Sequence, residues 1–399
     1  MIQSISKSLI IVFAVTLSIV ACSPKKNSQT HQFSGDIFGT QYRVILATTE
    51  EHPLDVTKRK VIKKAVAAKL AQIDQIMSHY RQDSELTYLN RAPIQQKIRM
   101  SEPMYQVLAL SQQLYQKTDG FFDVTLQPLI EFWGFGTQNP RKNLPQQHET
   151  DMLKQRIGSD QFVLSVREPQ EDQSSSQDQA YLLKKKPLTF NLSAIAKGYA
   201  VDQLAAMLEQ DYAVHHYLIN IGGEIRTSGH KAENQPWKIA IEAPFFNQRV
   251  LYKTLAVHTN SMAIASSGDY RNFYRIDDQI FSHTIHPVTG WPVQDAFASV
   301  SVIADTTAEA DAYATALMAM GKKQAWEFAE KNRLKAYFII RDAEQHKMQA
   351  QATQAFQEFM CTGINVTETH MIGSDPTKQF CLKPEKTQDI KLDGSLDAN

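Results

Sequence analysis

Strand-like and helix-like segments alternate along the chain between Phe33 and Asp342, and this alternation constrains the fold more than any other feature of the sequence. The segment 41–47 (QYRVILA) alternates like a half-buried strand, and apolar residues at helical spacing follow over 55–80. The other predicted strands cover 190–192, 217–221, 237–243, 255–257, 298–304 and 336–341, and the other predicted helices cover 104–117, 194–209 and 307–320. This mixture predicts a single α/β (α+β) domain.

The segment 167–186 interrupts the alternation with Gln, Ser, Asp and Lys residues, and we expect it to be a surface insertion. It ends in three lysines, Lys184–Lys186, a run more typical of a solvated loop than of a binding patch. The whole chain has 42 Lys and Arg against 42 Asp and Glu, so its formal net charge is zero. This balance gives no indication of a nucleic-acid partner.

The N-terminus has the pattern of an export signal. The apolar run Leu9–Val20 has the length of a signal-peptide core and is too short for a comfortable membrane span. It ends in the sequence IVAC, which resembles a bacterial lipobox, in which Cys22 is lipidated and becomes the first mature residue. We therefore expect a lipoprotein signal peptide over 1–21, then the lipidated cysteine and a polar tether over 22–33. An ordinary cleaved signal and an uncleaved anchor are the alternatives.

A lipid anchor would hold the folded part at a membrane of the bacterial envelope, facing the periplasm. Ser23 rather than Asp follows the cysteine, which favours the outer membrane. Outside the cytoplasm, Cys361 and Cys381 can form a disulfide bond. We expect this bond in a C-terminal extension over 344–399 with a disordered end. A catalytic or metal-binding role for these cysteines is the alternative, although neither has a CxxC spacing.

The segment Asn191–Tyr199 (NLSAIAKGY) enters the predicted helix 194–209. Asn191 or a serine can cap such a helix, while free N–H groups at its N-terminus favour an anion such as a diphosphate. Lys197 adds a positive charge one turn into the helix. A capped helix without a ligand explains these residues equally well. The sequence Gly222-Gly223-Glu224 likewise indicates either close approach of the backbone to a ligand or a plain hairpin bend.

His283, in the segment 282–293 (SHTIHPVTGWPV), is a candidate general base or phosphate contact, because neutral imidazole can accept a proton near pH 7. A buried histidine bonded to a main-chain carbonyl is the alternative. Asp311 and Thr315 share one face of the predicted helix 307–320. Their hard oxygen atoms suit Mg²⁺, whereas an exposed pair without a ligand is the alternative. Alanines surround Asp311, so we expect it to be partly buried, where a carboxylate needs a partner such as a cation.

Taken together and in order, eight motifs resemble the ApbE-like FAD:protein FMN transferases, periplasmic flavin transferases that are often lipoproteins. The motifs are FGT (38–40), MSHYRQDSELTYLN (77–90), TDGFFDVTLQPLIEFWGFG (118–136), NLSAIAKGYAVD (191–202), YLINIGGEIRTSG (217–229), ASSGDYRNFY (265–274), HTIHPVTGWPV (283–293) and ADAYATALMAMG (310–321). Each motif is weak by itself, but their combination and order are specific.

The resemblance implies a mixed domain of the T-fold-like kind over 34–343, with FAD in a cleft between subregions. It implies an enzyme that moves FMN from FAD to a Thr or Ser hydroxyl of an acceptor protein and releases AMP. Typical acceptors of the family are redox-pump subunits and FMN-binding domains, and the inner membrane is its more usual location. An FAD diphosphatase that uses water as the acceptor and a non-catalytic flavin carrier are the rival interpretations.

The resemblance also assigns roles to individual positions. FAD contacts are implied for Phe38, Tyr80, Phe121, Phe122, Asp123, Asn191, Lys197 and Ile285. Mg²⁺ ligands are implied for the main-chain carbonyl of Ala194 and the side chains of Asp311 and Thr315, and His283 is implied to handle the proton of the acceptor hydroxyl. The sequence departs from the family at Asn191 and His286, where Asp is usual. Asn keeps the geometry without the charge, and we expect His286 to accommodate a local turn.

Overall fold

The computed structural model describes residues 29–49, 53–167, 179–245, 250–257, 259–270, 272–277, 279–342, 347–361 and 390–391. The predicted signal peptide, Cys22 and Cys381 lie outside these ranges, and so does most of the predicted insertion. Cys361 is disulfide-bonded, and its pairing with Cys381 stays a prediction. Within the described ranges, no helix is long and apolar enough to cross a membrane.

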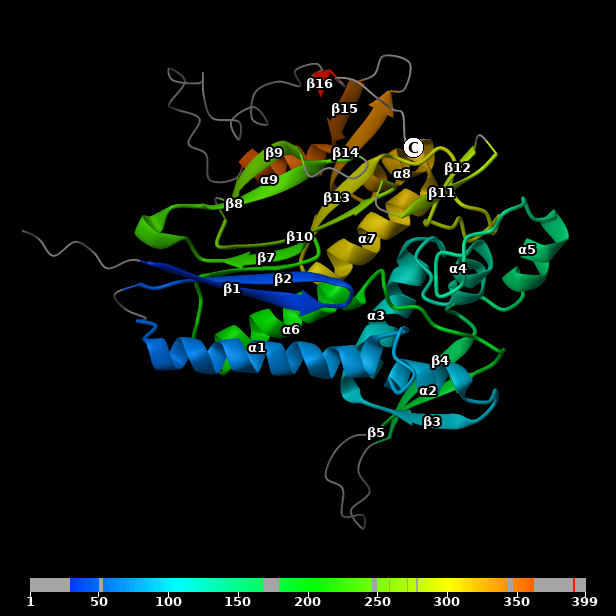
Figure 1. Cartoon of the computed structure of the whole chain (residues 1–399), viewed down its shortest axis with the longest axis horizontal. Helices are drawn as coiled ribbons and strands as arrows, with labels where there is room; N and C mark the ends of the chain where they lie inside the picture. The colour runs from blue at the N-terminus through cyan, green and yellow to red at the C-terminus, as the bar shows by residue number, and fades with distance from the viewer. Residues whose placement is uncertain are drawn as a thin grey trace, which may run out of the picture.

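One antiparallel sheet of nine strands organises the described part of the chain (Figure 1). Its strands, in spatial order, are β1 (Thr30–Ile37), β2 (Thr40–Ala47), β6 (Tyr217–Ile221), β7 (Glu224–Ser228), β10 (Ser261–Gly268), β13 (Ser299–Ala304), β14 (Lys335–Asp342), β15 (Lys347–Ala352) and β16 (Ile390–Lys391). Smaller sheets are formed by β3 (Lys97–Met100), β5 (Gln179–Lys184) and β4 (Phe162–Arg167), by β8 (Trp237–Ala243) and β9 (Val250–Val257), and by β11 (Phe273–Ile276) and β12 (Gln279–Ser282).

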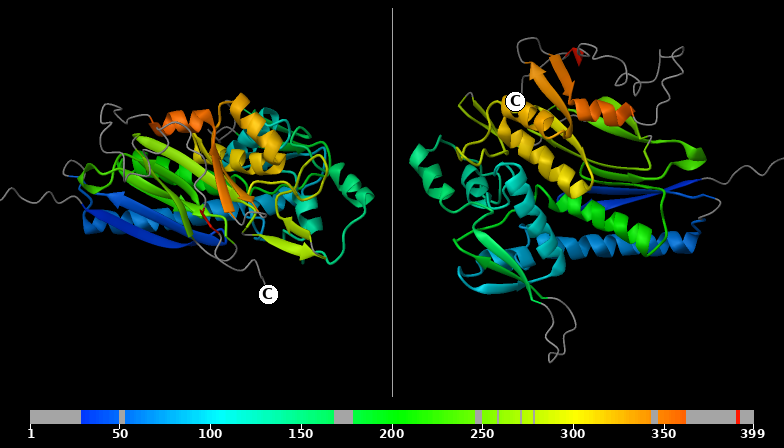
Figure 2. Two further views of the ribbon diagram at one scale, coloured as in Figure 1. Left: turned by 90° about the horizontal axis from the view of Figure 1, so that it is seen from above. Right: turned by 180° about the vertical axis from the view of Figure 1, so that it is seen from behind.

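The helices of the described residues are α1 (Val56–Met77), α2 (Glu85–Arg91), α3 (Glu102–Lys117), α4 (Gln127–Trp133), α5 (Gln147–Lys154), α6 (Ala196–Gln210), α7 (Thr307–Met320), α8 (Lys322–Lys331) and α9 (Gln354–Cys361). The helices α6 and α7 pack on the sheet and on each other, and α1 packs outside α6. The segments from α2 to α5, with β3, β4 and β5, gather at one end of the molecule, away from β8 and β9 (Figures 1 and 2).

The alternation of side chains along each strand divides the core between the two faces of the sheet. On β2, the buried Val44 and Leu46 pack with the helices α1, α3, α6 and α7. Their neighbours Ile45 and Ala47 face the opposite way and pack with the β8–β9 hairpin and α9. A separate apolar cluster forms around the buried Trp133 of α4 and Phe281 of β12. The half-buried pattern expected for this strand therefore holds only for 41–43, whereas the continuous apolar run 44–47 (VILA) lies between two apolar layers.

Most of the predicted elements are confirmed, including β2, α3, β6, β8 and the predicted helix 307–320, which is α7. The predicted strand 190–192 is wrong. The main chain of Phe190 bonds to a side chain instead of a strand, since the Asn90 amide donates to the Phe190 carbonyl at 3.0 Å and accepts from its N–H at 2.7 Å. A side chain 100 residues away thus replaces the neighbouring strand that we expected.

The interpretation of Lys184 as part of a solvated run is also wrong. Lys184 ends β5, and its side chain is 1% exposed. Its ammonium group donates to the main-chain carbonyls of Leu89, Asn90 and Leu188 at 3.0 to 3.3 Å. Burial lowers the pKa of Lys184, and these three carbonyls solvate the charge in place of water.

The sheet continues beyond residue 343, where we placed the start of the C-terminal extension. The strand β15 pairs with β14, and α9 packs on β14. Phe356 of α9 is completely buried in the cluster beneath β8 and β9. The helix α9, which carries Cys361, is therefore part of the apolar cluster between the large sheet and the β8–β9 hairpin.

Candidate functional site

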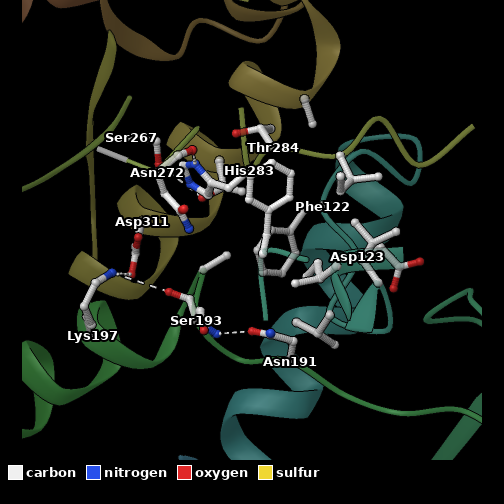
Figure 3. Close-up of a pocket in the computed structure, with 18 of the residues that line it drawn as sticks. Phe122, Asp123, Asn191, Ser193, Lys197, Ser267, Asn272, His283, Thr284 and Asp311 are labelled. Atoms are coloured by element: carbon white, nitrogen blue, oxygen red, sulfur yellow. Dashed lines mark hydrogen bonds and ion pairs between the residues drawn. The ribbon is translucent and has the colours of Figure 1, made fainter. Parts of the chain in front are cut away.

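A cavity of about 330 Å³ opens where β6, β7 and β10 approach α6, α7 and the loop before α4 (Figure 3). Of the residues predicted for the site, Tyr80, Phe121, Phe122, Asp123, Asn191, Ala194, Lys197, His283, Ile285, Asp311 and Thr315 line it. Phe38 is not among its lining residues. It lies at a positive φ of 52° in the turn between β1 and β2, two residues before Thr40, whose side chain is close to the cavity-lining Gly222.

The charged end of the cavity depends on the close approach of α6 and α7. Gly198 is on α6, and a Cβ atom at this position would lie 2.4 Å from the carbonyl oxygen of Thr307. No real Cβ makes such a contact, so only glycine lets the two helices come this close. The Gly198 N–H then donates to Asp311 Oδ2 at 3.2 Å. Gly198 therefore allows α6, which carries Lys197, to lie directly against Asp311 of α7.

Three charged side chains meet at this end of the cavity, and Figure 3 shows two of them, Lys197 and Asp311. The Lys197 ammonium lies 3.1 Å from Glu224 Oε1 and 3.6 Å from Asp311 Oδ2. Both carboxylate side chains are almost fully buried, with exposures of 3% and 4%. The second oxygen of Glu224, Oε2, is buried and has no hydrogen-bond partner among the described residues. Two buried carboxylates thus share one ammonium group, which leaves a deficit of positive charge.

Burial and charge act in opposite directions on these groups. Burial lowers the pKa of Lys197, but the carboxylates of Asp311 and Glu224 outweigh this effect, so its pKa is raised and the lysine stays protonated. Burial raises the pKa of Glu224 to about 7, against the opposing effect of Lys197. Burial likewise raises the pKa of Asp311 despite Lys197 and the Gly198 N–H. The cluster therefore favours an additional cation.

The residues predicted to hold Mg²⁺ offer a suitable set of oxygen atoms. Ala194, Asp311 and Thr315 all line the cavity, and the Thr315 hydroxyl lies 3.2 Å from that of Ser267. The described residues contain no cluster of three or more His, Cys, Asp or Glu side chains arranged for a metal. One carboxylate, one hydroxyl and one carbonyl are nevertheless compatible with Mg²⁺, which usually keeps waters and substrate phosphates as further ligands. The donor set fits a magnesium ion that keeps water molecules as its remaining ligands, some of which a phosphorylated substrate can replace.

His283 lies in the cavity next to Asn272 (Figure 3). Its Nδ1 is 3.3 Å from the Asn272 carbonyl oxygen, which can only accept, so we assign the proton to Nδ1. This assignment leaves Nε2 as the acceptor nitrogen. Burial lowers the pKa of His283, while the hydrogen bond to Asn272 and the charge of Asp269 oppose the shift. The imidazole is therefore neutral near pH 7 and can take up a proton.

Aromatic and aliphatic side chains form the other end of the cavity. Phe121, Phe122 and Ile285 are buried there, whereas Tyr80 is 63% exposed at its edge and its ring lies tilted against that of His79. The Phe121 ring meets the His286 ring edge-on at a centroid distance of 5.2 Å. One cavity thus offers flat apolar surfaces at one end and charged groups at the other, as a ligand with an aromatic part and a phosphorylated part requires.

The local role predicted for His286 is confirmed. Its Nδ1 accepts hydrogen bonds from the N–H groups of Val288 and Thr289 at 3.2 and 3.4 Å. A neutral imidazole here performs the turn-closing function that an Asp side chain commonly has. Burial lowers the pKa of His286 and so favours this neutral form.

Two predicted site residues use their polar atoms to shape the cavity. Asp123 Oδ1 accepts from Ser159 and from the N–H and hydroxyl of Thr125, and its carboxylate points away from Lys197 (Figure 3). Asn191 accepts from the Ser193 N–H at 2.9 Å and donates to Gln127 at 2.6 Å. It does not cap α6, whose N-cap residue makes no side-chain bond.

The match to known proteins agrees with this site. The family model described as the ApbE family matches residues 38–338. The chain belongs to the ApbE family. A protein of Haemophilus influenzae named FAD:protein FMN transferase is 36% identical over 337 residues, which cover 83% of this chain and 92% of that protein. A protein of Escherichia coli K12 with the same name is 31% identical over 352 residues, covering 86% and 95% of the two chains.

Solved structures of the ApbE family share the fold. The apo form of the flavinyl transferase ApbE from Pseudomonas stutzeri superposes with a TM-score of 0.70 at 30% identity, covering 85% of this chain and 98% of that one. The flavin transferase ApbE from Vibrio cholerae superposes with a TM-score of 0.69 at 30% identity, covering 83% and 99%. The expected mixed α/β architecture of the ApbE kind is therefore confirmed.

Sequence reasoning missed four residues that shape this ApbE site: Glu224, His79, Ser193 and Asn272. Glu224 was visible only as the residue after two glycines, and nothing nearby in the sequence indicated its pairing with Lys197. His79 lies within 3.4 Å of the Ser193 hydroxyl, although 114 residues separate them. Contacts over such separations leave no local pattern, and only the motif that contains each residue could have drawn attention to it.

Proposed function

We propose that this protein transfers FMN from FAD to a Thr or Ser hydroxyl of an acceptor protein and releases AMP. The observation that carries the proposal is the composition of the cavity. It brings His283, whose Nε2 is the acceptor nitrogen, the Lys197–Asp311–Glu224 cluster and the aromatic pair Phe121–Phe122 into one site. The names of the relatives supply the reaction, and these groups have the chemistry that the reaction needs.

In the proposed reaction, the acceptor hydroxyl oxygen attacks the phosphorus on the FMN side of the FAD diphosphate. A new bond forms between this oxygen and phosphorus, and the bond from phosphorus to the bridging oxygen breaks, so AMP leaves with the bridging oxygen. His283 takes the hydroxyl proton at Nε2. Such a displacement depends mainly on alignment and on compensation of negative charge.

Lys197 would compensate part of the diphosphate charge, and it is held in place by its ion pairs. The residues Asp311, Thr315 and Ala194 would hold Mg²⁺, which supplies further charge compensation at the diphosphate when it is bound. Phe121 and Phe122 would hold the flavin ring against their apolar surfaces. Because both phenylalanine side chains are buried, their rings are already in place when the flavin binds and before the acceptor arrives.

The experiment combines the full-length chain with FAD, Mg²⁺ and an FMN-binding acceptor domain, and then measures the mass of the acceptor. We expect a gain equal to one FMN, which EDTA should abolish. An acceptor whose target Thr is replaced by Val is the matched control and should gain nothing. Free FMN and AMP without acceptor labelling would identify a diphosphatase instead. Bound FAD without any reaction would identify a carrier.

We further propose that Cys22 is lipidated and holds the protein at the periplasmic surface of an envelope membrane. The IVAC sequence after an apolar run supports this assignment. Radiolabelled palmitate should label the unmodified protein, and Cys22→Ala should lose both the label and membrane association. Palmitate labelling of the Cys22→Ala variant would contradict the proposal.

A further inference from the structure

Glu224 is a buried carboxylate in the cavity for which the transfer mechanism has no role. It follows the tight turn Gly222-Gly223, where both glycines have positive φ. A Cβ atom on Gly222 would meet the Thr40 side chain at 2.9 Å and Glu224 Oε2 at 3.3 Å. Glycine at position 222 therefore avoids crowding of the Thr40 side chain and the Glu224 carboxylate.

The position of Lys197 raises a question about metal binding. Its ammonium lies 3.6 Å from Asp311 Oδ2, and Asp311 is the carboxylate proposed to hold Mg²⁺. The lysine therefore occupies part of the space and satisfies part of the charge that a cation at Asp311 would take. A cation can bind well only if the Lys197 ammonium moves away from Asp311, and a partly buried ammonium without a counter-charge is unfavourable.

Glu224 resolves this conflict. It is the nearer partner of Lys197, at 3.1 Å, and its Oε2 has no hydrogen-bond partner among the described residues. We propose that Glu224 is a positioning residue that retains the ammonium group of Lys197 when Asp311 binds the metal ion. Glu224 acts through Lys197 and does not itself bind the metal. This inference rests on the proposed Mg²⁺ site. It adds an exchange of partners, in which Asp311 replaces Lys197 with the metal ion and Lys197 stays paired with Glu224.

Binding of the cation also changes the net charge of the cavity before the diphosphate binds. With both carboxylates ionised, the three groups carry one net negative charge, which attracts a divalent cation and repels a diphosphate. After the cation binds, the net charge is positive and attracts a diphosphate. Because Glu224 keeps Lys197 nearby, its ammonium group is then available to the same diphosphate.

The test measures Mn²⁺ binding to the full-length chain without FAD, by the electron paramagnetic resonance signal of free Mn²⁺. Glu224→Gln keeps the size of the side chain but removes the charge that receives Lys197. We expect it to weaken Mn²⁺ binding about tenfold, within the range measured for coupled groups in contact. Lys197→Gln removes the competitor for Asp311, and we expect stronger binding.

The double variant distinguishes a positioning residue from a metal ligand. If Glu224 acts by holding Lys197, Glu224→Gln should have no effect in the Lys197→Gln background. A loss of Mn²⁺ affinity in both backgrounds would make Glu224 a direct ligand and overturn the proposal. Unchanged affinity in the Glu224→Gln variant alone would overturn it too. If Glu224→Gln does not fold, a failure of Lys197→Gln to raise the affinity would also refute the exchange.

Glu209→Gln is the matched control, because Glu209 lies on α6 and accepts a 2.6 Å hydrogen bond from Tyr217 outside the cavity. Its Mn²⁺ affinity should equal that of the unmodified chain. Metal binding is measured here without flavin transfer, so the two proposals fail separately. If the Mn²⁺ affinities of the variants change as expected but the acceptor protein gains no FMN, the proposed function alone is refuted. No Mn²⁺ binding by the unmodified chain would refute the exchange and the metal site together.

Discussion

Gly198→Ala tests whether the close contact of α6 and α7 assembles the charged end of the cavity. The added Cβ atom would lie 2.4 Å from the Thr307 carbonyl oxygen and 2.7 Å from Ala308 Cα. Both neighbours are main-chain atoms that cannot rotate away, so the helices must separate by roughly an ångström, as overpacked cores do. That movement draws the Gly198 N–H and Lys197 away from Asp311.

The magnitude follows from two opposing effects. Overpacking of this kind costs about 1–3 kcal/mol, whereas alanine is about 1 kcal/mol more favourable than glycine inside a helix. We therefore expect a net loss of about 1–2 kcal/mol in the free energy of unfolding, because the main-chain contact places the packing cost at the upper end of its range. The transfer rate should fall by more than this loss explains, because the folded variant still has a distorted site.

Urea unfolding measures the first quantity, and acceptor labelling at a temperature where the variant is fully folded measures the second. Ala206→Gly is the matched control on α6, since Ala206 is not part of the buried core cluster. It should cost about 1 kcal/mol through helix propensity and leave the transfer rate unchanged. Unchanged stability and unchanged transfer in Gly198→Ala would refute the reasoning.

Three further predictions concern the remaining side chains of the site and its turn. Asp311→Ala should abolish transfer without loss of fold in circular dichroism, and normal rates in excess Mg²⁺ would refute the metal assignment. At saturating Mg²⁺, the step in the pH profile of kcat/KM that belongs to His283 should lie below the ordinary histidine range, with the rate falling as the pH decreases. The reason is that burial lowers the pKa of His283 and the base acts in its neutral form. His286→Ala should lose about 1–2 kcal/mol in urea unfolding since two N–H groups lose their acceptor, whereas His286→Asp should retain the turn. Equal losses in both variants would contradict this role.

Several elements could be predicted from the sequence because their pattern is local. The helical spacing and small residues of 307–320 predict α7 and place Asp311 and Thr315 on one face. The motifs around Lys197 and His283 identify the cavity, and both residues line it. Where a partner far away in the chain replaces the local one, the same reasoning fails, as at Phe190, whose main chain bonds to Asn90.

The sequence by itself therefore determined the element types, the family and the candidate reacting groups, because periodicity and motif order are properties of neighbouring residues. Only the tertiary structure decided which of these groups meet and in which electrical environment. Gly198 and Asp311 are 113 residues apart, and their contact exists only because α6 and α7 pack against each other. The packing of both helices on β7 adds Glu224 to this contact and gives Lys197 two acidic partners. Burial and charge pairing depend on atoms brought together from distant segments, so no local pattern could have revealed them.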